Sequence, residues 1–128
     1  MQVLQIETDG TARVILLDGE DVLGGLQRLV DGPVTCISTD TYRSGLVLDV
    51  WVNEEGLLRE DFAENEAGLA LTGQWVVGPV VVADVDDYGD TRTLSAVHLN
   101  LLADKLGVKV DDNNGAGYTL DALDAVAS

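Results

Sequence analysis

Residues 84–90, Asp-Val-Asp-Asp-Tyr-Gly-Asp, form the densest group of potential metal ligands in the chain. Calcium loops place oxygen ligands at alternate positions and a glycine at the sixth, and Asp84, Asp86 and Gly89 satisfy that spacing. Tyr88, however, stands at the fifth position, and Ser95 stands where a bidentate glutamate normally closes the cage. The preceding segment also has the pattern of a strand, where a calcium loop follows a helix. We therefore interpret this segment as a solvated acidic turn and expect no metal.

Nucleophilic and zinc chemistry is limited by a single cysteine, Cys36, and a single histidine, His98. Structural zinc sites use four ligands, mostly cysteine and histidine, so their usual set is incomplete. Cys36 lies in an apolar run, which indicates a buried thiol rather than a nucleophile. His98 lies at the edge of the apolar face of a predicted helix, and the nearby sequence implies no partnered serine, cysteine or carboxylate. Phosphate-binding glycine loops are absent as well. We expect no enzyme active site and no cofactor.

The charge balance restricts the partners of the chain. In 128 residues, 23 Asp and Glu oppose 7 Lys and Arg, for a net charge of −16. Such a charge repels nucleic acids and anionic membranes and attracts basic protein surfaces. A GC-rich genome or a salt-rich cytoplasm would give the same acidity without a function, and both explanations stay open. The longest apolar stretch is far shorter than the about 20 residues that cross a bilayer, and the first residues lack the basic region of a signal peptide. We expect a cytoplasmic protein.

Apolar and β-branched runs predict the strands of a sheet. Strands are expected at residues 3–6, 12–17, 34–38, 45–52, 74–83 and 108–110. The first two are joined by an Asp-Gly pair, which is favoured in tight hairpins. The strand at 74–83 is nearly continuous in valine, which indicates burial on both faces, and Gly78-Pro79 predicts a bulge or an edge position within it.

Apolar residues at helical spacing predict the helices. One helix is expected over 22–30 with Asp18 as its N-cap, and a short one over 64–70 that ends at Gly73. A second main helix is expected behind Thr93, and a short C-terminal helix behind Thr119. The second main helix is predicted to bury Leu94, Val97, Leu101, Leu102 and Leu106 on one face.

These elements predict one α+β domain over residues 1–128. Strands come mostly as neighbours rather than alternating with helices, which favours a mixed, mostly antiparallel sheet over a doubly wound one. We expect about five to six strands, two main helices and the short C-terminal helix.

Two motifs give the chain a family resemblance: the turn Asn53-Glu54-Glu55-Gly56 with Asn65 beyond it, and the strand Val76-Val77-Gly78-Pro79-Val80-Val81-Val82. Together they resemble a family of small proteins common in bacteriophages and mobile elements, catalogued as a domain of unknown function. The resemblance covers residues 2–85, and residues 91–128 form a helical C-terminal extension outside it. It implies an accessory phage protein that acts in the host cytoplasm.

The residues that carry the resemblance are also the candidate binding residues, together with Trp75. In one interpretation Asn53 caps its turn and Asn65 fixes the following loop through backbone hydrogen bonds. In the other, they line a pocket beside Gly78-Pro79, where backbone groups are free to meet a ligand. Trp51 and Trp75 either pack in the core or offer an aromatic platform. The candidate binding residues are Asn53, Glu54, Glu55, Gly56, Asn65, Trp75, Gly78 and Pro79.

Two classes of function fit these observations. The first is a non-catalytic protein that binds a host protein with a basic surface, as a counter-defence or regulatory inhibitor, with DNA mimicry as one form. The second is a protein that binds or sequesters a small ligand such as a nucleotide. An anionic ligand would require Arg43, Arg59 and Arg92 to converge on one pocket. Neither class involves direct nucleic-acid or membrane binding, and the oligomeric state stays open.

Overall fold

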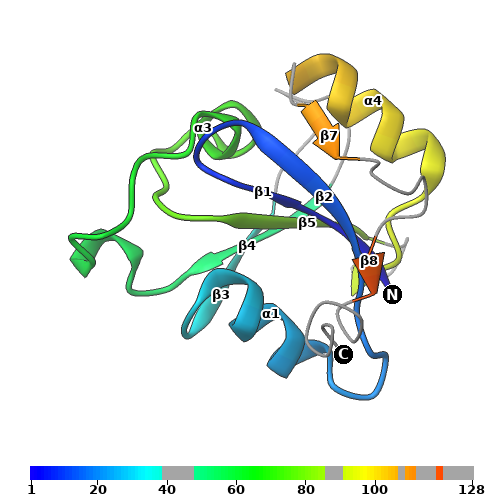
Figure 1. Cartoon of the computed structure of the whole chain (residues 1–128), viewed down its shortest axis with the longest axis horizontal. Helices are drawn as coiled ribbons and strands as arrows, with labels where there is room; N and C mark the ends of the chain where they lie inside the picture. Colours follow the sequence, from blue (N-terminus) through cyan, green and yellow to red (C-terminus); the bar gives the residue numbers. More distant parts are fainter. Residues whose placement is uncertain (39–47, 86–90, 107–108, 112–117, 120–128) are drawn as a thin grey trace.

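A mixed β-sheet forms the centre of the protein (Figure 1). The computed structural model describes residues 1–38, 48–85, 91–106, 109–111 and 118–119. Their strands are β1 (Gln2–Ile6), β2 (Thr11–Leu16), β3 (Val34–Ser38), β4 (Leu48–Asn53), β5 (Val80–Val85), β6 (Thr91–Arg92), β7 (Lys109–Asp111) and β8 (Tyr118–Thr119). The sheet has the order β3-β4-β5-β1-β2-β7, with β6 paired to β5 and β8 paired to β2. Only β7 and β8 run parallel to their neighbour, so the predicted α+β class is confirmed. The count exceeds the expected five to six because β6 and β8 are two-residue strands.

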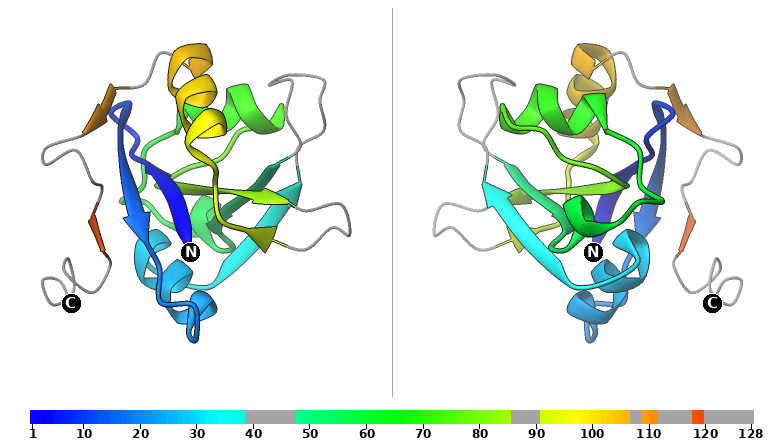
Figure 2. Two further views of the ribbon diagram at one scale, coloured as in Figure 1. Left: turned by 90° about the vertical axis from the view of Figure 1, so that its right-hand side faces the viewer. Right: turned by 90° about the vertical axis from the view of Figure 1, so that its left-hand side faces the viewer.

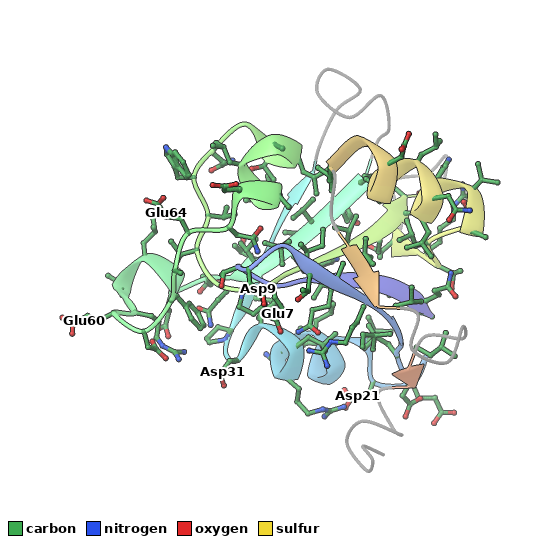
Figure 3. The ribbon with its side chains drawn as sticks, turned by 45° about the horizontal axis from the view of Figure 1, so that its top comes forward. Glu7, Asp9, Asp21, Asp31, Glu60 and Glu64 are labelled. Carbon is green, nitrogen blue, oxygen red and sulfur yellow. The ribbon has the colours of Figure 1, made fainter. Side chains whose placement is uncertain are left out.

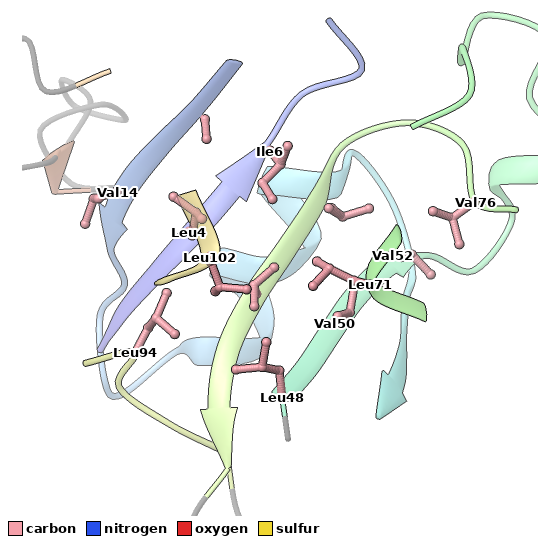
Figure 4. Close-up of a cluster of buried hydrophobic side chains, with 13 residues drawn as sticks. Leu4, Ile6, Val14, Leu48, Val50, Val52, Leu71, Val76, Leu94 and Leu102 are labelled. Atoms are coloured by element: carbon pink, nitrogen blue, oxygen red, sulfur yellow. The ribbon is translucent and has the colours of Figure 1, made fainter. Parts of the chain in front are cut away.

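Helices cover both faces of this sheet (Figure 2). They are α1 (Val22–Val30), the 3-10 turn η1 (Gly56–Leu58), α3 (Glu66–Thr72) and α4 (Ala96–Leu106). Side chains alternate between faces along a strand, so Val3 packs with α1 while its neighbour Leu4 packs with α3 and α4. The larger core lies on the α3 and α4 face, where Leu71 and Leu102 meet the sheet (Figure 4).

The valine strand is buried on both faces, as its composition predicts. It lies between β1 and β4, and its residues from Val80 to Asp84 are all buried. It begins at Val80, however, and not at Gln74 as expected. Gly78 adopts φ +79°, which takes the chain out of the strand conformation, and before it only Val77 makes an isolated bridge, to Glu64. The predicted irregularity at Gly78-Pro79 therefore starts the strand instead of interrupting it.

The N-cap of α1 is Asp21, not Asp18. The Asp21 side chain accepts the backbone N–H of Gly24 at 3.1 Å. Asp18 instead accepts the backbone N–H of Glu20 at 2.9 Å, which forms a turn just before the helix. Both aspartates are capping residues by type, and the one nearer the helix takes the role. The helix ends at Asp31, as expected, in a left-handed conformation.

A similar shift occurs at α4, which Ser95 caps instead of Thr93. The Ser95 hydroxyl accepts the N–H of His98 at 3.1 Å, whereas the Thr93 hydroxyl accepts the N–H of Gln2 in β1 at 3.0 Å. The predicted buried face is therefore partly wrong. Leu102 is buried, but Val97 and Leu101 are 67% and 40% exposed. Leu99 and Leu106 pack on the core together with Leu102.

A buried carboxylate joins α4 to the sheet. Asp84 in β5 is 1% exposed, and its carboxylate accepts the N–H of Ser95 at 3.0 Å and lies 2.6 Å from Nδ1 of His98. His98 therefore has the carboxylate partner that its sequence neighbourhood did not imply. The same contacts correct the interpretation of residues 84–90, because Asp84 lies in a strand and both of its oxygens are occupied. Residues 86–90 lie outside the described part of the chain.

Two further expectations fall at the margins of the described residues. Thr119, the expected cap of a C-terminal helix, is the last residue of β8. The C-terminal helix expected after it would occupy residues 120–128, which lie outside the described residues, as do residues 45–47 of the expected fourth strand.

The Asp84–His98 contact predicts a measurable cost when it is removed. We expect His98→Ala to lower the free energy of unfolding by about 1–3 kcal/mol, because it leaves a buried carboxylate short of a partner. Asn100→Ala, at an exposed position of the same helix, is expected to change it by less than about 0.5 kcal/mol. Urea unfolding of both variants measures the difference. Equal stabilities of the two variants would contradict this role of His98.

Candidate functional site

Four of the predicted binding residues line one cavity. It has a volume of about 160 Å³ and lies where β3 and β4 meet η1 and the segment before β5. We call it the β3–η1 cavity. Its lining residues are Thr35, Ile37, Val52, Asn53, Glu54, Gly56, Leu57, Gln74, Trp75, Val76 and Val77. The predicted residues Asn53, Glu54, Gly56 and Trp75 thus come together, with Glu55 exposed beside them.

Asn53 is held by hydrogen bonds on both sides of its amide. Its Nδ2 donates to the backbone oxygens of Val30 and Asp31 at 3.0 and 3.1 Å, and its Oδ1 accepts the N–H of Glu55 at 2.7 Å. It is 6% exposed. The side chain therefore stabilises both the end of α1 and the turn into η1. These are the bonds of the capping interpretation, and they leave the amide of Asn53 no free group for a ligand.

Asn65 has an equally complete set of bonds. Its Nδ2 donates to the backbone oxygens of Ile6 and Gly78, both at 3.0 Å, and its Oδ1 accepts the N–H of Gly68 at 3.0 Å as the N-cap of α3. It is 1% exposed. It borders a different cavity, of about 460 Å³, between the β1–β2 turn and α3. The two asparagines therefore do not share a pocket.

Gly78 and Pro79 line neither of these two cavities, and both backbone groups of Gly78 are already bonded within the protein. The N–H of Gly78 donates to the oxygen of Ala63 at 2.8 Å, and its oxygen accepts from Asn65. Proline has no N–H to offer. A Cβ at Gly78 would lie 2.7 Å from the Phe62 ring, so glycine is required here by packing as well as by its positive φ.

Arg59 ties the η1 segment to the end of α1. Its guanidinium donates to the Asp61 carboxylate at 2.7 Å and to the Asp31 carboxylate at 3.1 Å, and it stacks 4.3 Å from the centre of the Phe62 ring. Hydrogen bonds with Asp61 and then Asp31 raise the pKa of Arg59 above its ordinary value. The side chain is thus fully engaged within the protein.

Three large apolar side chains around the β3–η1 cavity are exposed. Leu57, Leu58 and Trp75 are 78%, 82% and 55% exposed, and we call them the η1 surface. Leu57 and Trp75 line the cavity itself. Sequence reasoning identified Trp75 but missed both leucines and Ile37. One signal was available for the leucines. Leu57 and Leu58 are adjacent in a polar segment whose apolar residues follow neither the helical nor the strand spacing that predicts burial.

Two other residues singled out in the sequence, Trp51 and Cys36, pair across β4 and β3. Trp51 is partly buried against the core on the α1 face of the sheet, and its Nε1 has no acceptor among the described residues. Burial and the neighbouring Asp49 carboxylate raise the pKa of the Cys36 thiol to about 12. The thiol therefore stays protonated at neutral pH, although Cys36 is partly buried where a buried thiol was expected.

No cationic side chain is among the described residues that line either cavity. The larger cavity is bordered instead by the carboxylates of Glu7, Asp9 and Glu66. Arg92 lies on β6 opposite Asp84, beside the start of β4, whereas Arg59 follows the far end of β4. These two arginines do not converge, and the third, Arg43, lies outside the described residues. The arrangement does not favour a nucleotide or another anionic small ligand.

The bonds of Asn65 predict a large effect of its removal. We expect Asn65→Ala to lower the free energy of unfolding by about 2–4 kcal/mol, because an N-cap is lost and two buried carbonyls lose their donor. Gln74→Ala, at an exposed position after the same helix, is the control and should differ from wild type by less than about 0.5 kcal/mol. Chemical unfolding gives both values. A cost for Asn65→Ala as small as that of the control would show that these bonds do not hold in solution.

Comparisons with known proteins place most of the chain in one family. No curated protein and no solved structure gave a significant match. Within the described residues, no helix is long and apolar enough to cross a membrane, and no group of three or more potential metal ligands occurs. The model of the family described as "Domain of unknown function (DUF3846)" matches residues 1–107, from β1 through α4, and so extends beyond the residues 2–85 that carry the resemblance. The chain therefore belongs to the DUF3846 family.

Proposed function

We propose that this protein is a non-catalytic accessory protein that acts by binding another protein through the η1 surface. The observation that carries the proposal is the exposure of Leu57 and Trp75 on the lining of the β3–η1 cavity, together with exposed Leu58 next to Leu57 in the chain. Exposed apolar side chains that gather at one place and have a polar surround are typical of protein-binding surfaces. Tryptophan in particular is enriched among the residues that dominate binding energy.

The size of the cavity favours a protein partner over a small ligand. Its volume of about 160 Å³ is well below the roughly 300–1,000 Å³ of small-molecule sites. It is close to the roughly 150 Å³ of a cavity that holds a benzene molecule. The β3–η1 cavity therefore fits a single aromatic or large aliphatic side chain. Such a side chain, inserted between Ile37 and Trp75, would be the central contact of an interface.

The charges around this surface define the partner further. Exposed carboxylates flank Leu57 and Leu58 in the sequence, within the segment 54–64 that contains η1. Figure 3 shows two of the acidic residues of this segment, Glu60 and Glu64. The exposed acidic residues of this segment are Glu54, Glu55, Glu60, Asp61 and Glu64. Together with the net charge of −16, they favour association with a basic protein surface. The partner thus combines an apolar side chain with neighbouring lysine or arginine.

The surface is also pre-organised. Asn53 fixes the turn that leads into η1, and Arg59 fixes the segment that leaves it through Asp31. A segment that is already held in place loses less conformational entropy on binding, so more of the contact energy appears as affinity.

The biological setting of the proposal comes from the resemblance to small phage and mobile-element proteins. In that setting the protein acts in the host cytoplasm as a counter-defence or regulatory inhibitor. DNA mimicry is the less favoured form, since the carboxylates labelled in Figure 3 come from separate elements. Three of them are already paired: Glu7 with Arg13, Asp21 with Arg28 and Asp31 with Arg59. Exposed leucines also have no counterpart in a phosphate backbone.

Affinity capture from a bacterial lysate with matched variants tests the proposal. Wild type is expected to retain a partner at low salt and to lose it at about 0.5 M salt, where the Debye length falls to a few ångströms. The double variant Leu57→Ser/Trp75→Ala is expected to lose the same partner even at low salt. Leu23→Ser, which changes an exposed leucine on α1, is the control and should retain that partner. A partner held equally by all three proteins, or by none, would contradict the proposal.

A further inference from the structure

Strand β3 forms an edge of the sheet directly beside the β3–η1 cavity. Among the described residues it pairs only with β4. Its sequence, Val34-Thr35-Cys36-Ile37-Ser38, contains no charged residue. Exposed edge strands normally carry lysine, proline or a bulge that prevents pairing with another chain. Within the strand β3 has none of these.

The register shows which backbone groups of β3 point outward. The N–H of Glu54 donates to the oxygen of Pro33 at 2.7 Å, so these two residues form a hydrogen-bonded pair of the antiparallel ladder. Such pairs alternate with non-hydrogen-bonded pairs along the ladder. Thr35 and Ile37 therefore direct their backbone groups toward β4, while Val34 and Cys36 direct theirs away from it. No hydrogen bond from the described part of the chain reaches these outward groups.

The side chains of the same strand connect this edge to the cavity. Thr35 and Ile37 both line the β3–η1 cavity, together with Leu57 and Trp75. Side chains on paired strands lie next to each other on the same face. A strand added beside β3 would therefore place every second side chain next to Thr35 or Ile37, at the mouth of the cavity.

We propose that the partner binds as an extended segment that adds a strand to the outer edge of β3, the side that faces away from β4. The outward amide groups of Val34 and Cys36 bond its backbone, and one large apolar side chain enters the β3–η1 cavity. Basic residues that flank this side chain meet the carboxylates of the η1 segment, such as Glu54. The inference rests on the proposed function and specifies its mode, which is a known way of recognising peptides at sheet edges. A second copy of this chain is a poorer occupant because each copy carries a charge of −16.

A library of random linear peptides displayed on phage, selected against the full chain, provides the probe. The expected peptides contain one aromatic or large aliphatic residue and flanking lysine or arginine. The best peptide is then synthesised with one backbone nitrogen methylated at a time, which removes a single N–H donor. Strand addition predicts that methylation weakens binding at every second residue and is tolerated at the residues between, because only alternate amides face β3.

Variants of β3 test the same bonds from the side of the protein. Cys36→Pro removes an outward N–H, whereas Cys36→Val keeps it and preserves an apolar side chain. We expect Cys36→Pro to weaken peptide binding by about tenfold, equivalent to about one hydrogen bond, and Cys36→Val to leave it unchanged. Thermal melting identifies a Cys36→Pro protein that has not folded, in which case the methylation series alone decides.

The other outcomes overturn strand addition and are separable from the failure of the proposed function. In one outcome, methylation of the peptide is tolerated equally at every residue while Leu57→Ser/Trp75→Ala still abolishes binding. That result means that the peptide docks on the η1 surface without strand pairing. Selected peptides with helical spacing of their apolar residues mean a helix in the cavity. A dimer in sedimentation that Cys36→Pro dissociates means a second copy at the edge. A library that yields no binding peptide also refutes a linear segment, while the capture experiment tests the η1 surface independently.

Discussion

Two buried side-chain amides support the connections from which the exposed surface projects. Asn65 joins the last carbonyl of β1, the carbonyl of Gly78 and the first turn of α3. Asn53 joins the end of α1 to the turn before η1. Each amide is satisfied on both its oxygen and its nitrogen, so neither a shorter side chain nor a charged one can replace it without leaving buried backbone groups unpaired. The sheet and its helices provide the body, and these bonds fix the loops on it.

Buried polar groups and exposed apolar groups therefore have different roles in this protein. Polar side chains that usually suggest chemistry, Asn53, Asn65 and the Asp84–His98 pair, are used internally to hold turns and helix ends. The residues left for a partner are leucines, a tryptophan and the edge of β3. High negative charge complements this arrangement, because it opposes self-association at an apolar edge while attracting basic partners. This distribution of groups is what supports the proposed role in protein binding.

Sequence patterns predicted the parts of the fold that depend on local periodicity. The valines of β5 and the apolar stripe of α1 specify burial directly, and both elements form: β5 from Val80 onward in the centre of the sheet, and α1 against one of its faces. Helix starts were less predictable because two capping residues compete within a few positions, as Thr93 and Ser95 do. The Asp84–His98 contact depends on how α4 packs against β5, which no local pattern encodes. The exposure of Leu57 and Leu58 was missed because their only signal is weak: a pair of leucines in a polar segment without helical or strand periodicity.

Hydrogen exchange of the side-chain amide protons of Asn53 and Asn65, followed by NMR in the free protein, tests the central claim most directly. Both amides are buried and bonded, whereas Asn100 on α4 is exposed and serves as the internal reference. We predict that the side-chain amide protons of Asn53 and Asn65 exchange far more slowly than those of Asn100. Exchange of either one at the rate of Asn100 would show that its amide is open to water, and would contradict the claim that these bonds fix the exposed surface.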